Sequence, residues 1–179
     1  MPNEAMDTNR GTDPSCCGSE LQFDKGDVHD DLRRVIELLF FAYRDFTGEA
    51  DVILAKYGFG RAHHRAIYFI GQNPGIAVNE LLAILDITKQ SLGRVLTKLL
   101  KEGYVLQQRD PSDGRKRLLK LSAAGLGLES VLTKRQGLRM QNAFKVAGPD
   151  SEARFKQVLK SMVDDPRALI LRGAVIDDE

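Results

Sequence analysis

A short segment in the middle of the chain carries side chains that suit contact with DNA. Gln90, Arg94 and Lys98 recur at every fourth position, so in a helix they lie along one line of its surface. Arg bonds O6 and N7 of guanine, Gln bonds N6 and N7 of adenine, and Lys or Thr binds phosphates. The candidates for DNA contact in this segment are Thr88, Lys89, Gln90, Ser91, Arg94 and Lys98. A polar helix face is more often simply exposed to solvent, so the flanking sequence has to show whether this one contacts DNA.

Charge is distributed unevenly along the 179 residues, although the formal net charge is only +1. Residues 1–31 hold eight acidic and two basic side chains, a net −6, whereas residues 88–120 hold nine basic and three acidic ones, a net +6. The basic block marks a candidate surface for an anionic partner such as double-stranded DNA. Residues 1–29 mix Gly, Ser, Pro, Asn and Asp without periodicity, so we interpret them as a disordered acidic arm.

The apolar pattern around the basic block predicts a helix-turn-helix. Apolar side chains at helical spacing predict helices over residues 61–72 and 78–85, and a further helix that Thr88 caps and that ends at Gly103. The last two helices are short and are separated by a turn of about three residues, as in a helix-turn-helix. In the last helix a row of leucine and valine side chains faces the core, which leaves the polar candidates on the opposite face.

A basic hairpin is predicted directly after the helix-turn-helix. Residues 104–109 and 116–121 read as two strands, and the segment between them, Asp110 to Arg115, contains Pro and Gly. Its candidates for DNA contact are Arg109, Asp113, Arg115, Lys116 and Arg117. We expect Asp113 to accept hydrogen bonds from Arg115 or from loop N–H groups and so to orient Arg115; the alternative is an exposed ion pair that only stabilises the loop. A helix-turn-helix followed by such a hairpin is a winged helix.

Long helices on either side of the winged helix predict a dimer. Residues 30–57 carry apolar side chains on two faces, and further helices are predicted from Ser122 to about residue 145 and after Gly148. A helix with two apolar faces needs a second helical partner, so we expect a homodimer. The candidate dimer contacts are Leu32, Val35, Leu39, Phe155, Val158, Leu159 and Met162.

These elements predict a mainly α fold with a small β-hairpin wing. A winged helix-turn-helix at residues 61–121 is embedded in a helical dimerisation region at residues 30–60 and 122–165. The arm at residues 1–29 precedes it, and a tail at residues 166–179 follows.

Particular residues in the predicted winged helix resemble the MarR family of bacterial transcription regulators. They comprise the runs Asn79-Glu80-Leu81-Leu82, Ile87-Thr88-Lys89-Gln90-Ser91-Leu92-Gly93-Arg94-Val95-Leu96, Leu99-Leu100-Lys101-Glu102-Gly103-Tyr104-Val105, Arg109-Asp110-Pro111-Ser112-Asp113-Gly114-Arg115 and Leu119-Lys120-Leu121-Ser122-Ala123-Ala124-Gly125. Gly60-Arg61-Ala62-His63-His64-Arg65 is similar to the PetP branch of that family. The resemblance implies a homodimer whose winged helices read successive major grooves of a pseudo-palindromic operator, with each wing in a minor groove.

Two further groups of residues are candidates for sensing. Tyr43, His63, His64 and Tyr68 could line the pocket that the resemblance implies between dimer core and winged helix, where a small effector of unknown identity would bind; surface histidines and core aromatics are the simpler interpretation. A shared metal is not expected, because adjacent helical residues point about 100° apart. Cys16-Cys17 could respond to oxidants, but without a fixed positive neighbour we favour unreactive thiols.

The sequence gives no reason to expect an enzyme, a cofactor or a membrane protein. It contains no Gly-rich phosphate loop, no nucleophile elbow and no His-Glu-x-x-His motif. It also lacks a membrane-spanning apolar run and a signal peptide, so we expect a cytoplasmic protein. The alternative to a DNA-binding regulator is a winged helix that binds another protein and has no specific DNA site.

Overall fold

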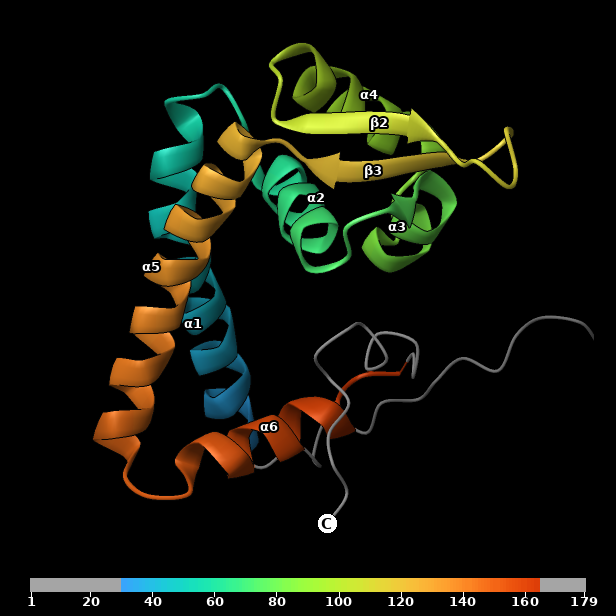
Figure 1. Cartoon of the computed structure of the whole chain (residues 1–179). Helices are drawn as coiled ribbons and strands as arrows, with labels where there is room; N and C mark the ends of the chain where they lie inside the picture. Colours follow the sequence, from blue (N-terminus) through green and yellow to red (C-terminus); the bar gives the residue numbers. More distant parts are fainter. Residues whose placement is uncertain (1–29, 165–179) are drawn as a thin grey trace, which may run out of the picture. The chain divides into compact units, whose positions relative to one another are not determined.

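The computed structural model of the chain describes residues 30–164 (Figure 1). The predictions about the arm at residues 1–29, Cys16-Cys17 and the tail at residues 166–179 lie outside the described residues. The chain divides into two units at Leu38, inside its first helix. Of the first unit, the structure describes residues 30–38, which are helical and exposed. All elements after that belong to the second unit.

Six helices and three strands make up the described residues. In chain order they are α1 (Asp30–Ala55), α2 (Arg61–Gln72), β1 (Ile76–Ala77), α3 (Val78–Leu85), α4 (Lys89–Lys101), β2 (Val105–Arg109), β3 (Arg117–Leu121), α5 (Ala123–Ala147) and α6 (Ser151–Ser161). The predicted helices are all present, with α1 ending slightly before the predicted residue 57 because Lys56 to Gly58 form a turn. No helix within residues 30–164 is both long and apolar enough to span a bilayer.

Local sequence explains how the helix-turn-helix is built. Asp86 ends α3 in the left-handed region, with φ of 47°, which turns the chain sharply. Thr88 then caps α4: its Oγ1 accepts a hydrogen bond from the N–H of Ser91 at 3.2 Å. The predicted cap at Thr88 is therefore present, and it fixes where α4 begins.

The sheet has one more strand than the sequence predicted. The strand order is β1-β3-β2, with both pairs antiparallel (Figure 1). β1 pairs Ile76 with Leu119 and Ala77 with Leu118, so the predicted two-stranded hairpin is in fact a three-stranded sheet. A two-residue strand shows no periodicity of its own, and β1 exists because β3 offers a free edge.

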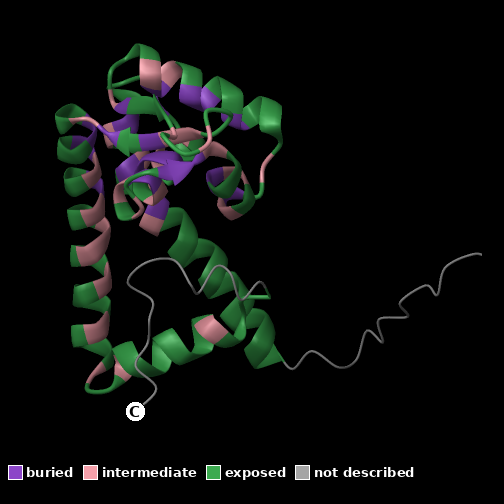
Figure 2. Ribbon diagram, turned by 45° about the vertical axis from the view of Figure 1, so that its right-hand side comes forward, coloured by how far each residue is buried: buried purple, intermediate pink, exposed green. Residues whose placement is uncertain are grey.

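One apolar core holds the winged helix together and reaches into α1 and α5 (Figure 2). Its largest fully buried side chains are Leu54, Ile67, Ile70, Leu81, Leu85, Leu92, Leu99, Leu119 and Leu132. Each contributes roughly 1.5–3 kcal/mol on burial. Because Leu92 and Leu99 both belong to α4, this burial fixes which face of α4 turns to solvent.

The junction between the winged helix and α5 depends on a glycine. Ser122 caps α5, its Oγ accepting from the N–H of Gly125 at 3.1 Å, and the Ser122 N–H donates to the carbonyl of Tyr104 at 3.0 Å. Gly125 is buried so close to the Tyr104 carbonyl that an added Cβ would overlap its oxygen. The first turn of α5 can therefore approach Tyr104, the residue before β2, only at a residue without a side chain.

We expect Gly125→Ala to destabilise the protein by about 1–3 kcal/mol or more, because backbone must move to admit the methyl group. Thermal or urea unfolding measures the effect. The matched control is Gly127→Ala in the same helix, where an added Cβ meets nothing within 4 Å. That control should gain up to about 1 kcal/mol of stability through helix propensity. Equal effects of the two substitutions would contradict the close approach at Gly125.

Candidate nucleic-acid interface

The solvent-facing side of α4 carries most of the predicted DNA-contacting side chains. Lys89, Gln90, Ser91 and Arg94 are exposed, as is Thr88 just before the helix, whereas the leucine and valine row is buried. A shallow hollow on this side is lined by Gln90, Gly93, Arg94, Thr97, Lys98, Lys101 and Glu102. Gly93 lowers the helix stability by about 1 kcal/mol relative to Ala. This side of α4 therefore presents hydrogen-bond donors and acceptors at helical spacing around Gly93, which has no side chain.

Lys98 does not lie on the open surface as the four-residue spacing predicted. It is half-buried, and its Nζ donates to the carbonyl of Gly58 in the turn that follows α1. The same ammonium group lies 5.4 Å from the centre of the Phe59 ring, within cation–π distance. The flexible stem of Lys98 thus lets its ammonium group contact its own protein, whereas Gln90 and Arg94 of the predicted line are exposed.

The wing loop is organised by Asp110, which the sequence analysis did not single out. Its Oδ1 accepts hydrogen bonds from the N–H of Ser112 at 2.8 Å, from Ser112 Oγ at 2.7 Å and from the N–H of Asp113 at 3.4 Å. The hydrogen bonds from Ser112 hold the pKa of the Asp110 carboxyl below its ordinary value. An Asp followed by Pro and Ser is a recognisable turn signal.

Asp113 shapes the wing through the backbone rather than through an ion pair. Its Oδ1 accepts from the N–H of Arg115 at 3.0 Å, and its carbonyl accepts from the N–H of Lys116 at 2.8 Å. Of the two donors expected for Asp113, the loop N–H is the one present. Among residues 30–164 no ion pair joins Asp113 to Arg115. The Arg115 side chain itself is exposed.

Two arginines face each other where the wing meets the sheet. Arg109 of β2 is directly opposite Arg117 of β3 in the antiparallel register. The Arg117 guanidinium donates from Nη1 to the carbonyl of Gly114 at 3.0 Å, which holds it against the loop. Like charges opposite each other on a sheet repel, and an anion placed between them would relieve that repulsion. Lys116, which is exposed, adds a third cation nearby in the chain.

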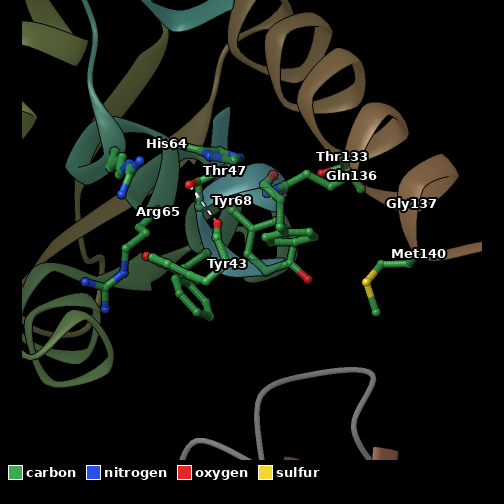
Figure 3. A pocket seen from close by; sticks show the side chains of 12 residues that line it. Tyr43, Thr47, His64, Arg65, Tyr68, Thr133, Gln136, Gly137 and Met140 are labelled. Atoms are coloured by element: carbon green, nitrogen blue, oxygen red, sulfur yellow. Dashed lines mark hydrogen bonds between the residues drawn. The ribbon is translucent and has the colours of Figure 1, made fainter. Parts of the chain in front are cut away.

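A cavity of about 420 Å³ lies between α1, α2 and α5 (Figure 3). Its lining includes three of the four predicted residues, Tyr43, His64 and Tyr68. The other lining residues are Phe46, Thr47, Arg61, Arg65, Phe69, Thr133, Gln136, Gly137 and Met140. Those on α5 could not be foreseen, because nothing local indicates which face of α5 meets α1.

His63 is not part of this cavity, so its assignment to the pocket is corrected. Its Nδ1 accepts a hydrogen bond from the N–H of Gly60 at 3.1 Å, which caps the start of α2. Its ring stacks on Phe59 with centroids 5.0 Å apart. His64, the next residue, is rotated about 100° around the helix and therefore faces the cavity instead.

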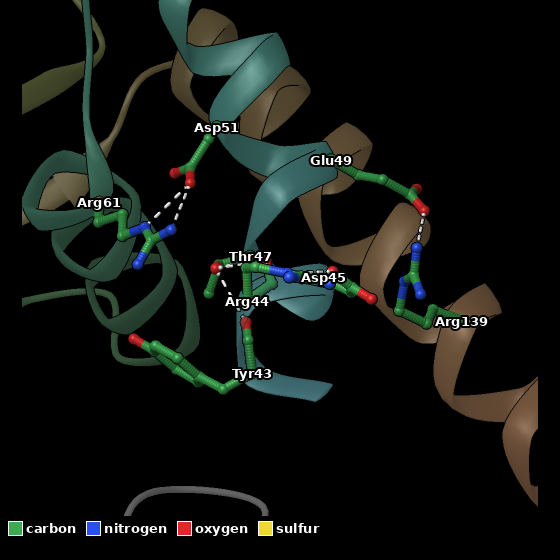
Figure 4. Close-up of polar contacts among 8 residues, drawn as sticks. All are labelled: Tyr43, Arg44, Asp45, Thr47, Glu49, Asp51, Arg61 and Arg139. Atoms are coloured by element: carbon green, nitrogen blue, oxygen red, sulfur yellow. Dashed lines mark hydrogen bonds and ion pairs between the residues drawn. The ribbon is translucent and has the colours of Figure 1, made fainter. Parts of the chain in front are cut away.

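The two cavity arginines have different partners. Arg61 pairs with Asp51 of α1 at 2.8 Å, beside an Arg139–Glu49 pair that links α5 to α1 (Figure 4). Arg65 donates from Nη2 to the carbonyl of Leu85, the last residue of α3, at 2.8 Å. The cavity wall is thus connected to α1 on one side and to the helix-turn-helix on the other.

Comparison with known proteins identifies the family. Residues 57–116 match the MarR family. The HTH-type transcriptional regulator PetP of Rhodobacter capsulatus is 47% identical over 133 residues, which cover 74% of this chain and 80% of PetP. The chain belongs to the MarR family. The resemblance noted in the sequence is confirmed, and the family is one of transcription regulators.

Solved structures show that the fold is also that of the MarR family. FabT of Streptococcus pneumoniae, solved in complex with DNA, matches with a TM-score of 0.66 at 18% identity, over 74% of this chain and 94% of FabT. A MarR protein from Peptoclostridium difficile matches with a TM-score of 0.62 at 22% identity, over 82% of this chain and 92% of the other. The predicted mainly helical winged-helix fold is confirmed.

The pKa values of two histidines of this MarR-family protein, His63 and His64, are lowered. Burial lowers the pKa of His64, opposed by the carboxylates of Asp51 and Glu129. Burial and the Lys98 ammonium lower the pKa of His63. Within residues 30–164 no three His, Cys, Asp or Glu side chains gather closely enough to hold a metal ion.

We expect the thermal midpoint of this MarR-family protein to fall as the pH decreases below about 6.5, the ordinary pKa of histidine. The unfolded chain then binds protons that the folded His63 and His64 resist, so stability is complete above that pH and is lost as pH falls toward the lowered folded pKa values. His64→Gln should flatten this dependence, measured by thermal unfolding across a pH series. An unchanged slope in the variant would contradict the assignment to His64.

Proposed function

We propose that this MarR-family protein is a homodimeric transcription regulator that binds a pseudo-palindromic DNA operator by sequence. The observation that carries the proposal is the exposed polar face of α4, held in one orientation by the Thr88 cap and by the buried Leu92 and Leu99. FabT, which shares this fold, was solved in complex with DNA, and this supports the proposal. Because such a regulator must reach the chromosome, we place it in the cytoplasm.

We assign sequence readout to Gln90 and Arg94. Both are exposed on the side of α4 opposite the core, and each has the fork of polar atoms that bonds a purine in the major groove. Thr88, Lys89 and Ser91, at the start of the helix, would meet phosphates, which the positive end of the helix dipole also favours. Lys98 would support the site from within by holding the turn at Gly58.

We assign the minor groove to Arg115. Asp110 and Asp113 hold the wing backbone, which leaves the Arg115 side chain at an exposed and preorganised position. A narrow minor groove has a strongly negative potential that attracts an inserted arginine. Phosphates flanking that groove would sit near Lys116 and between Arg109 and Arg117, where they would relieve the repulsion between the two guanidinium groups.

Exposed apolar side chains support dimerisation through α1 and α6. The predicted contacts Leu32, Val35, Leu39, Phe155, Val158, Leu159 and Met162 are between 39% and 58% exposed. Single exposed apolar residues are common, but two helices that each expose a row of them indicate an unfilled interface. A second copy of the chain supplies the same helices, so a two-fold contact would bury both rows.

We assign the cavity between α1, α2 and α5 to a small effector. Tyr43, His64 and Tyr68 line it together with Arg65, whose guanidinium donates to the carbonyl of Leu85 at the end of α3. An effector that attracts the Arg65 guanidinium would compete with that carbonyl. Its binding would then change how α3 and the Thr88 turn are held, and hence the orientation of α4.

Selection of bound sequences from a random DNA pool, using purified protein, tests the proposal. Enrichment of an inverted repeat is the expected result. The alternative, a winged helix that binds a protein partner, predicts that no sequence is enriched. The salt dependence of binding also distinguishes the two hypotheses, because affinity for DNA falls steeply as the salt concentration rises whereas an apolar protein interface responds little.

Arg115→Ala should weaken operator affinity more than about tenfold and lower the salt slope by about 1, with the unfolding midpoint nearly unchanged. Fluorescence anisotropy across a salt series measures both quantities. The control is Arg135→Ala, an exposed arginine of α5. Asp113→Ala should also weaken binding, although it removes a negative charge, because Arg115 loses its backbone anchor. Tighter binding by Asp113→Ala would leave charge attraction as the sufficient explanation.

Val158→Glu should convert the dimer to a monomer by placing a charge in the proposed interface, at a cost of about 3 kcal/mol or more than a hundredfold in the dimer Kd. Val158 is 55% exposed within one chain, so the protomer itself should fold normally. The control is Gln157→Glu, one position away on the same helix and also exposed. Light scattering at micromolar concentration distinguishes the states. A monomeric unmodified protein would refute dimerisation.

A further inference from the structure

Gly93 is an unexplained residue at the centre of the exposed face of α4. It follows Gln90 by one turn and directly precedes Arg94. Its φ is not positive, so the helix does not require a glycine there. Among residues 30–164 an added Cβ would meet nothing within 4 Å, so close packing of these residues does not require a glycine either. Glycine weakens a helix interior, so Gly93 lowers the stability of α4 although no contact among the described residues requires it.

The missing side chain leaves a hollow whose rim consists of polar groups. Gln90, Arg94 and Thr97 line it together with Gly93. A bare Cα has no donor or acceptor, so whatever meets it is selected by shape and not by hydrogen bonding. On the major-groove edge of DNA the 5-methyl group of thymine is the one apolar projection.

We propose that Gly93 is a specificity-determining residue that accepts a thymine 5-methyl group against its Cα, between the flanking bonds of Gln90 and Arg94. The inference rests on the proposed DNA-binding function and deepens it by naming the base read at this position. It predicts one thymine in each half-site whose methyl group contributes to affinity. It also predicts that any side chain at residue 93 holds that base pair away from the helix.

The first test is whether Gly93→Ala has opposite effects on thermal stability and on operator affinity. Gly93→Ala should raise the thermal midpoint by roughly 2–4 °C, because alanine favours the helix and meets no neighbour. The same variant should bind the operator selected by the unmodified protein about tenfold more weakly. Gly127→Ala is the matched control: it should show the rise in midpoint without the loss of affinity.

Removal of the methyl group from DNA is the second test. Each operator thymine of one half-site is replaced in turn by deoxyuridine, which lacks only the 5-methyl group. The unmodified protein should lose about fourfold in affinity at one position, as expected for one methyl group returned to water. Gly93→Ala should show no loss at that position, because its own methyl group has already displaced the base.

Three results would overturn the proposal. Gly93→Ala could bind the operator as tightly as the unmodified protein, or its midpoint could fall, which would show that residue 93 is packed. Deoxyuridine could also reduce the affinity of both proteins equally, which would place the methyl contact on another residue. These results differ from a failure of the proposed function itself, in which the unmodified protein enriches no sequence from the random pool.

Discussion

The backbone N–H and carbonyl of Tyr104 determine how the winged helix is arranged relative to α5. Its N–H donates to the carbonyl of Leu99 at 2.9 Å, and its carbonyl accepts from the N–H of Ser122 at 3.0 Å. These two bonds join the end of α4, the start of β2 and the start of α5. Gly125 packs against the same carbonyl, so α5 cannot shift without breaking the junction. The orientation of α4 is therefore set relative to α5 by backbone groups, which no surface substitution alters.

The two faces of α4 are coupled by that constraint. Because Leu92 and Leu99 are fully buried, a rotation of the helix that moved Gln90 or Arg94 would also expose apolar surface. The buried leucines therefore hold the polar face of α4 in one orientation. Gly93 fits this account: a rigid helix can use an empty position to read shape, whereas a mobile helix would simply close the gap.

The sequence predicts what depends on local pattern and fails where distant segments meet. The periodicity of apolar residues located the helices. The N-caps of α4 and α5 could be assigned to Thr88 and Ser122, because a cap depends only on nearby residues. β1 was missed because its two residues are ordered by β3, more than forty positions away. The contacts of Lys98 with Gly58 and Phe59 were not predicted, because residue spacing gives the direction of a Cβ but not the partner of a long side chain. His63 lies outside the cavity that His64 lines, because adjacent residues point in different directions around a helix. The role of Asp110 in the wing loop was not predicted, although Asp followed by Pro and Ser is a turn signal.

The positions of Arg61 and Arg65 explain why the cavity and the helix-turn-helix form one system. They are four residues apart on α2 and line the same cavity, yet Arg61 is held by a carboxylate and Arg65 by a neutral carbonyl. An ion pair with Asp51 satisfies the charge of Arg61, whereas the Leu85 carbonyl satisfies only one donor of Arg65 and none of its charge. A negative group entering the cavity therefore gains more from Arg65 than from Arg61. Arg65 is also the arginine that is bonded to α3, so a change at this contact would act on the helix-turn-helix.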